Sequence, residues 1–258
     1  MKVIINRIKQ YNFLFSELVK RDFKKRYKRT FLGIIWSIIG PLLELLVMAL
    51  IFTQFFGRDM PHFIIYLFAG KLVFAYFKES TTGGMQALLA NSGIITKIKV
   101  PKYIFLLSKN VASLINFLIL LVIFFVFTAV DGVAFTPKFF LLLYPVVLLL
   151  VFNVGMGLIL SAFYVFFRDV QYLYDIFTLL LMYLSAIFYT VDVFPYWAQR
   201  LFLLNPVYAY IHYFRLVVLE SVVPSINVHL ICLGYAIGAV LVGSIIYKVN
   251  NYRLVYYM

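Results

Sequence analysis

The sequence predicts an all-α integral membrane protein. We expect six transmembrane helices, an N-terminal amphipathic helix at the membrane interface, and a re-entrant helix pair between spans five and six. The chain of 258 residues is 64% hydrophobic and 13% charged, whereas soluble domains are about 45–50% apolar and about 25% charged. Its apolar residues form long segments separated by short turns. One soluble core does not hide so much apolar surface, so the membrane is the expected environment.

Six segments have the roughly 20 mostly apolar residues that a membrane-crossing helix needs. They are residues 33–56, 63–89, 103–130, 139–167, 171–189 and 228–248. Short connections such as GRDMPH, DGVAFTPK and RDV carry turn residues, which favours an up-and-down helical bundle. The chain therefore divides into an amphipathic cytoplasmic segment, 1–32, and a six-span transmembrane domain, 33–258.

The distribution of Lys and Arg predicts the orientation. Ten of the 23 Lys and Arg residues precede Gly33. If the N-terminus is cytoplasmic, seven more lie on that side, which makes 17 of the 23. These seven are Lys97, Lys99, Lys102, Lys109, Arg168, Lys248 and Arg253. Because cytoplasmic loops of membrane proteins carry an excess of Lys and Arg, both termini are expected in the cytoplasm.

The N-terminal segment has the pattern of a helix that lies in the membrane surface. Between residues 11 and 29 an apolar row recurs at every fourth position, and cations occupy the other faces. The row is Phe15, Val19, Phe23 and Tyr27. Membrane lipids are the expected partner, and nucleic acid is not, although the net charge of +13 would otherwise suggest it. A plain topology signal is the alternative interpretation.

Residues 193–220 are too apolar for a solvated loop. A seventh span would move Lys248 and Arg253 to the outside. The Asn205–Pro206 step divides the segment into two halves of about ten residues, because proline restricts the preceding residue and lacks an N–H. Two short re-entrant helices are therefore expected, and backbone of this kind is tolerated where protein or a water-filled cavity surrounds it.

No catalytic motif is found, so the chain is not expected to be an enzyme. The single cysteine, Cys232, excludes an intramolecular disulfide, and no Cys or His spacing indicates a metal. The three histidines are scattered, and the first 30 residues do not have the pattern of a signal peptide. There is no GxxxxGK[ST] phosphate loop, so ATP-derived energy would have to come from another chain.

Several stretches, taken in order, carry a family resemblance. They are RDFKKRYKRTFLGIIWSIIGPLL, GKLVFAYFKES, NSGIITKIKVPKYIFLLS, FFRDVQYLYDIFTLLLMYLSAIFY and LLNPVYAYIHYFR. The chain resembles the membrane (permease) subunit of a type-2 ABC exporter of polysaccharides such as O-antigens, capsules and teichoic acids. It departs from the family at Lys71, where an aromatic-rich entry is usual, and at Glu44, which is unusually polar for a first span.

The resemblance implies a homodimer with two copies of a separate ABC ATPase, in the bacterial cytoplasmic (inner) membrane. It implies export of a glycan or polyol-phosphate polymer linked to a lipid pyrophosphate. No cofactor is expected in this chain, and ATP and Mg²⁺ are expected in the ATPase. Two alternatives stay open: a secondary transporter or channel without an ATPase, and a membrane-embedded lipid-linked sugar transferase.

A cytoplasmic segment that contacts the ATPase is expected between spans two and three. Asn91 or Ser92 can cap a short helix, three isoleucines give it an apolar face, and Pro101 ends it. The resemblance implies that this is a coupling helix, and a second contact is expected at the turn before span five, where Asp169 can cap the helix. The predicted coupling residues are Asn91, Ile94, Ile95, Lys97, Ile98, Lys99, Pro101, Arg168 and Asp169. A basic loop and a plain helix cap are the alternatives.

A route for sugars should be lined by aromatic rings and polar groups. The predicted pathway residues are Tyr66, Lys71, Phe74, Tyr76, Tyr183, Tyr189, Tyr196, Trp197, Tyr208 and Tyr210. Lys71 and Lys78 share one face of span two, where they either contact an acidic ligand or pair with Glu44. Cations of the N-terminal helix are predicted to contact the lipid head group at a cytoplasmic gate; they are Arg21, Lys24, Lys25 and Lys28.

Overall fold

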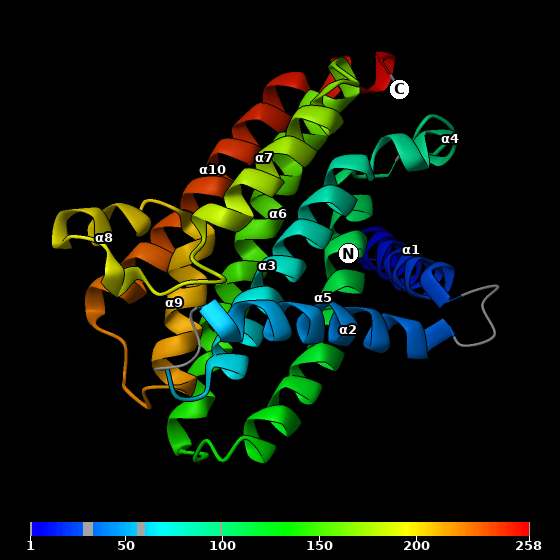
Figure 1. The fold of residues 1–258 in the computed structure, drawn as a ribbon. Helices are drawn as coiled ribbons and strands as arrows, with labels where there is room; N and C mark the ends of the chain where they lie inside the picture. Colours follow the sequence, from blue (N-terminus) through cyan, green and yellow to red (C-terminus); the bar gives the residue numbers. More distant parts are fainter. Residues whose placement is uncertain (1, 28–32, 56–59, 99, 258) are drawn as a thin grey trace.

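The computed structural model describes the whole chain except residues 1, 28–32, 56–59, 99 and 258 (Figure 1). All regular elements in the described residues are helical. The helices are α1 (Lys2–Tyr27), α2 (Gly33–Phe55), α3 (Phe63–Gln86), α4 (Ser92–Ile95), α5 (Tyr103–Val130), α6 (Leu143–Phe166), α7 (Val170–Leu184), α8 (Tyr196–Phe202), α9 (Pro206–Val218) and α10 (Ile226–Tyr256). Three 3₁₀ turns join them: η1 (Leu89–Asn91), η2 (Pro137–Leu142) and η3 (Val191–Val193). The all-helical prediction is confirmed.

Six helices (α2, α3, α5, α6, α7 and α10) overlap the apolar segments that the sequence predicts, but α7 ends at Leu184, before the predicted end of span five. Among the described residues, three helices are long and apolar enough to cross a membrane: α5, α6 together with η2, and α10 up to Asn250. A fourth candidate is the α8–α9 pair, which bends by 105° at its break. The other helices do not meet this criterion, because α3 contains three charged residues and α7 is only 15 residues long. In α2 the apolar stretch that qualifies by composition is Ile39–Phe52.

Helix α3 lies at the centre of the packing, between α5, α6 and α9. Its buried side includes Ile65, Leu67, Val73 and Phe77. Most of the large core cluster joins this side to buried residues of α5, α6 and α9. Such a long buried apolar surface holds the bundle together without any disulfide, since Cys232 is free.

Helices α6 and α10 approach each other so closely that glycine is required. A Cβ atom added to Gly155 would lie 2.4 Å from the carbonyl carbon of Ala239. One added to Gly243 would lie 2.7 Å from the carbonyl oxygen of Gly155. Real Cβ atoms do not approach other atoms at these distances, so the two glycines set the α6–α10 spacing.

The two ends of the bundle are distinct in Figure 1. Helix α4, the start of α7 and the C-terminus lie at one end, and the α5–η2 connection lies at the other. Helix α8 projects from the side of the molecule away from α1. The molecule therefore has one end that gathers the predicted coupling segments and another that carries the predicted outer loops.

Candidate functional site

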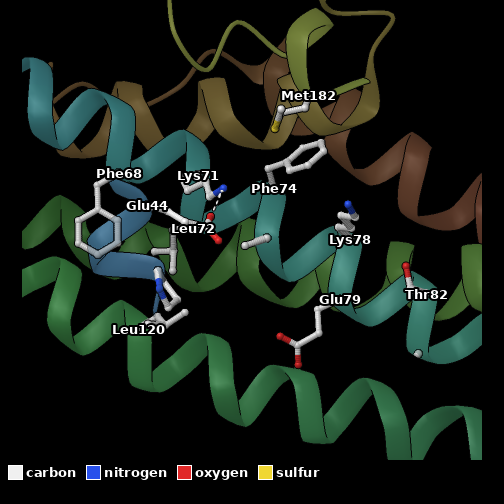
Figure 2. A pocket seen from close by; sticks show the side chains of 13 residues that line it. Glu44, Phe68, Lys71, Leu72, Phe74, Lys78, Glu79, Thr82, Leu120 and Met182 are labelled. Atoms are coloured by element: carbon white, nitrogen blue, oxygen red, sulfur yellow. Dashed lines mark ion pairs between the residues drawn. The ribbon is translucent and has the colours of Figure 1, made fainter. Parts of the chain in front are cut away.

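A cavity of about 550 Å³ lies along one face of α3 (Figure 2). Lys71, Lys78, Glu79 and Thr82 project into it from α3, and Glu44 enters from α2. Its apolar lining is contributed by α2, α3, α5 and α7; these residues are Pro41, Phe68, Leu72, Phe74, Ala75, Leu120 and Met182. We call this space the α3 cavity. Its walls are aromatic and aliphatic. Its charged groups lie near the middle of α3, and apolar helices surround α3.

An ion pair joins the two helices that flank the α3 cavity. The Nζ atom of Lys71 lies 2.6 Å from Oε2 of Glu44. The Lys71 side chain is 18% exposed, whereas that of Glu44 is 61% exposed. The predicted pairing of these residues is therefore present in the structure. The Glu44 carboxylate remains largely exposed although it is paired with Lys71.

The remaining polar groups are arranged along the same face. The Asn116 amide donates a 3.1 Å hydrogen bond to Oε2 of Glu79. Lys78 is exposed, and the buried Oγ1 atom of Thr82 has no hydrogen-bond partner among the described residues. The described residues that line the cavity include two lysines and two glutamates, whose formal charges cancel. It therefore offers both donors and acceptors without a net charge.

These charges do not suit contact with lipid tails. A charged side chain at the centre of a membrane helix costs about 2.5–3.5 kcal/mol on insertion scales, so such groups face protein or water. Glu44 and Lys78 are both exposed in the single chain. Around them on α2, Leu43, Val47 and Leu50 are exposed as well. The α3 face therefore fits a polar space enclosed by apolar helices.

Three of the predicted pathway residues lie in the core instead. The Tyr66 hydroxyl donates to the carbonyl oxygen of Tyr189 at 2.7 Å, and the Tyr210 hydroxyl donates to that of Cys232 at 2.8 Å. Tyr76 is buried with its ring centroid 4.8 Å from that of Phe117. Each ring is buried because neighbouring helices cover it. The order of aromatic residues in the sequence does not reveal this packing.

The other predicted pathway residues divide into separate groups. Lys71 and Phe74 line the α3 cavity. Tyr183 is exposed on α7, where its backbone oxygen accepts a 2.8 Å hydrogen bond from the Tyr189 hydroxyl. Tyr196 and Tyr208 line a second cavity beside α8, and Trp197 is exposed on the same helix. The structure thus distributes these residues over two cavities and the exposed surfaces of α7 and α8.

Arg215 is a central residue that the sequence pattern does not single out. It is 5% exposed, and its guanidinium donates to the backbone oxygens of Ala186 at 2.9 Å and of Tyr66 and Ile187 at 3.2 Å each. A Cβ atom at Gly70 would lie 2.8 Å from Nη2 of Arg215. The signal in the sequence is an arginine within an apolar segment, which needs polar partners in the protein interior.

The predicted coupling segment forms η1 and the single turn α4. The Asn91 side chain does not cap this turn but donates to the carbonyl oxygen of Ala87 at 2.7 Å. Ile95 is 7% exposed and packs into a cluster with α1 and α5, whereas Ile98 is 55% exposed. The three isoleucines therefore do not form one outward face. Only Ile98 presents a large apolar surface outward.

The cations of this segment differ in their surroundings. Lys97 is exposed, Pro101 is half-buried, and Lys99 lies outside the described residues. The half-buried Lys102 is the N-cap residue of α5, and burial lowers the pKa of its ammonium group. Of the predicted coupling residues in this segment that the structure describes, Lys97 and Ile98 are thus the exposed ones.

The second predicted contact is the turn between α6 and α7. Arg168 and Asp169 are both exposed, and the Arg168 guanidinium lies 5.8 Å from the centre of the Tyr164 ring. Asp169 occupies the N-cap position of α7, but its side chain makes no capping hydrogen bond. This turn lies at the same end of the bundle as α4 (Figure 1).

The N-terminal helix α1 is docked on α5. The carboxylate of the buried Asp22 lies 2.9 Å from Nη2 of Arg21 and 3.2 Å from Nζ of Lys109. Leu18 is buried in the cluster that contains Phe105. Part of the apolar side of α1 therefore packs on other helices of the protein, which the sequence did not predict. Lys24 and Lys25 are exposed, and Lys28 lies outside the described residues.

The described residues contain no group of three or more His, Cys, Asp or Glu side chains arranged to hold a metal ion. His62 pairs with Asp131, with Nδ1 and Oδ2 2.5 Å apart, and His229 accepts or donates a 2.9 Å hydrogen bond with the Tyr213 hydroxyl. These histidines are thus engaged in contacts between helices and connections.

Apolar helices long enough to cross a membrane, together with a charged cavity between them, define a membrane protein suited to transport. Residues 14–219 match the family model described as ABC-2 type transporter, and the chain belongs to this family. The family comprises the membrane subunits of ABC transporters. The resemblance drawn from the sequence motifs is therefore confirmed.

Individual relatives agree with the family. The chain is 33% identical to the O-antigen export system permease protein RfbA of Myxococcus xanthus, over 66% of this chain and 65% of that protein. It is 28% identical to an O-antigen export system permease protein RfbA of Klebsiella pneumoniae, over 95% of this chain and 96% of that protein. It is 24% identical to the polysialic acid transport protein KpsM of Escherichia coli, over 81% and 80%.

Proposed function

We propose that this chain is the membrane subunit of an ATP-driven exporter that moves a lipid-linked polysaccharide across the bacterial inner membrane. The proposal follows the relatives, which are named for export of O-antigen and transport of polysialic acid. The observation that carries it is the charged face of α3. Lys71, Lys78 and Glu79 lie in the middle of the bundle and open into a cavity rather than into the core.

The proposed route requires a second copy of the chain. Helix α7 exposes a nearly continuous apolar side, and so does the middle of α2. On α7 this side consists of Tyr172, Leu173, Ile176, Phe177, Leu179, Leu180, Tyr183 and Leu184. If two copies meet through α2 and α7, the α3 cavities of both face a shared space that lipid does not enter. The glycan then crosses in contact with Glu44, Lys78 and the aromatic wall.

In this arrangement the six spans are α2, α3, α5, α6, α7 and α10, and α8 and α9 form the re-entrant pair. Both termini are cytoplasmic, and α1 lies at the cytoplasmic surface with Lys24 and Lys25 near the lipid head groups. The 17 of 23 Lys and Arg residues on that side support this orientation.

Energy enters through a separate ATPase that binds ATP and Mg²⁺. We assign its docking surface to the end of the bundle that carries α4 and the Arg168–Asp169 turn. Lys97, Ile98 and Arg168 are exposed there. One exposed isoleucine between cations suits a small apolar cleft with an acidic rim on the ATPase.

Deletion and complementation in the source cells test the proposal. Cells without this chain should accumulate lipid-linked polymer in the cytoplasmic leaflet, and the chain should co-purify with an ABC ATPase whose activity the polymer stimulates. The wild-type gene should restore export. A chain with Lys78→Leu and Glu79→Leu should insert normally but export less than a tenth as much, because the cavity loses two of the four charged groups that the structure places there.

Ile64→Ala is a matched control, because Ile64 is exposed on the same helix and does not line the α3 cavity. It should export normally. Absence of polymer accumulation in the deletion strain, or purification of the chain without any ATPase, would refute the proposed function.

A further inference from the structure

A second and larger cavity, of about 1100 Å³, lies between α8, α9 and the first half of α10. It is lined by residues of η3, α8, α9 and the start of α10, which follow one another in the sequence. In Figure 1 these elements lie on the side of the molecule away from α1, and far from α4. We call this space the α8 cavity.

The walls of the α8 cavity are held in place by polar contacts. The Asn205 side chain accepts hydrogen bonds from the backbone N–H groups of Val207 and Tyr208, at 3.0 and 3.3 Å. Its amide donates to the Ser185 hydroxyl at 3.0 Å. The Tyr235 hydroxyl donates to the carbonyl oxygen of Leu203 at 2.9 Å. The bend between α8 and α9 is thus tied to both α7 and α10, so the cavity is formed before any ligand enters.

The lining combines opposite charges with stacked rings. Among the described residues that line the cavity, Asp192 and Arg200 are charged, and their formal charges cancel. The Arg200 guanidinium lies 4.6 Å from the centre of the Tyr196 ring and donates a 2.9 Å hydrogen bond to its hydroxyl. The rings of Tyr208 and His212 are stacked, with centroids 5.6 Å apart. Aromatic ring faces therefore lie in the same cavity as one hydrogen-bond acceptor, the Asp192 carboxylate, and one donor, the Arg200 guanidinium.

This chemistry matches an uncharged sugar. A carboxylate accepts hydrogen bonds from two neighbouring hydroxyls, a guanidinium donates two, and the C–H faces of a pyranose pack on aromatic rings. An anionic ligand would be attracted by Arg200 but repelled by Asp192. A cationic ligand would be attracted by Asp192 but repelled by Arg200. A neutral ligand rich in hydroxyls satisfies both residues at once.

We propose that the α8 cavity binds an uncharged sugar unit of the exported glycan, on the far side of the membrane from the ATPase. This inference rests on the proposed function, because it takes the glycan and the orientation from it. It adds a saccharide site outside the α3 cavity, with Asp192 and Arg200 as its polar contacts and Tyr196 and Tyr208 as its aromatic walls.

The chain offers a built-in reporter for a test. It has two tryptophans, and Trp197 follows the cavity-lining Tyr196 on α8. A Trp36→Phe variant of the full chain, purified in lipid nanodiscs, leaves Trp197 as the single tryptophan. The probe is the glycan released by mild acid from the lipid-linked polymer of the source cells. Sodium pyrophosphate is the comparison probe, since it represents a lipid phosphate head group.

The glycan should change the Trp197 emission in a saturable way, and pyrophosphate should not. Asp192→Ala and Arg200→Ala should each raise the Kd for the glycan by roughly tenfold or more, since each removes a charge-assisted contact. Leu201→Ala is the matched control, because Leu201 is exposed on α8 and does not line the cavity. It should leave the Kd unchanged. Unaltered melting temperatures of the variants establish that the fold is intact.

Two results would overturn the inference. One is a glycan Kd that Asp192→Ala and Arg200→Ala leave unchanged, or no saturable response to the glycan at all. The other is a response to pyrophosphate alone, which assigns the cavity to a lipid head group. Either result leaves the proposed function standing if the ATPase still co-purifies and the deletion strain still accumulates polymer. Loss of those two findings refutes the proposed function itself, whatever Trp197 reports.

Discussion

The Arg215 guanidinium carbon lies 3.3 Å from the centroid of the Tyr66 ring. The same guanidinium donates to the backbone oxygens of Tyr66, Ala186 and Ile187, so one buried cation joins α3, α9 and the break that follows α7. Cation–π contacts strengthen as water is excluded, and Arg215 is fully enclosed. These contacts hold the backbone in place at the residues that follow α7, before the re-entrant pair begins.

Replacement of Arg215 by lysine should destabilise the chain, because one ammonium cannot reach three separate carbonyl oxygens and lies less flat on the ring. Each buried carbonyl left without a donor costs about 1–3 kcal/mol. We expect the melting temperature to fall by roughly 5 °C or more. A thiol-reactive dye measures this directly, since the only cysteine, Cys232, is buried until the chain unfolds. The exposed Arg253, changed to lysine, should melt like the parent.

Ala186 has a backbone φ of +48°, which favours glycine. A left-handed conformation costs an L-residue roughly 1–2 kcal/mol, so Ala186→Gly should keep or raise the melting temperature. Ala186→Val should lower it strongly, because β-branched residues tolerate positive φ poorly and the site is fully buried. The same dye assay compares the two variants. Equal melting temperatures for glycine and valine would contradict this account of the bend.

The order of helices could be predicted from the sequence because the length of each apolar segment is a local property. The Arg215–Tyr66 contact could not, since its residues are 149 positions apart and no local pattern encodes them. Tyr66 and Tyr210 resemble pathway aromatics in sequence, and their burial depends on which helix covers them. Lys71 was recognisable because a charge inside an apolar segment needs a partner, and Glu44 was the acid within reach in the preceding span.

The Lys71–Glu44 ion pair should behave as a unit. Lys71→Glu places two carboxylates side by side on α2 and α3, and we expect poor accumulation in the membrane because the two like charges repel each other. The exchange Glu44→Lys with Lys71→Glu restores opposite charges and should recover at least half of the parent level. Quantitative blotting of membrane fractions measures both. An exchange variant no better than the single variant would show that the residues act separately.

The close approach of α6 and α10 predicts a sharp difference between two glycines. Gly155→Ala would put its methyl group 2.4 Å from the backbone of α10, so the helices must separate. Overpacking of this kind costs typically 1–3 kcal/mol, and the melting temperature should fall by several degrees. Gly238→Ala on α10 is the control, since a Cβ there has nothing within 4 Å. It should melt at or slightly above the parent temperature, because alanine favours the helix.

The coupling segment yields a test in which two neighbouring isoleucines behave differently. Ile98 is 55% exposed, so Ile98→Asp should leave the melting temperature unchanged yet weaken ATPase co-purification and polymer-stimulated ATP hydrolysis by tenfold or more. Ile95 is 7% exposed and packs against α1 and α5, so Ile95→Asp buries a carboxylate and should lower the melting temperature by itself. Loss of ATPase contact in the Ile95 variant would then reflect unfolding. If Ile98→Asp binds and stimulates the ATPase like the parent, the ATPase docks elsewhere, and the Arg168–Asp169 turn becomes the surface to change next.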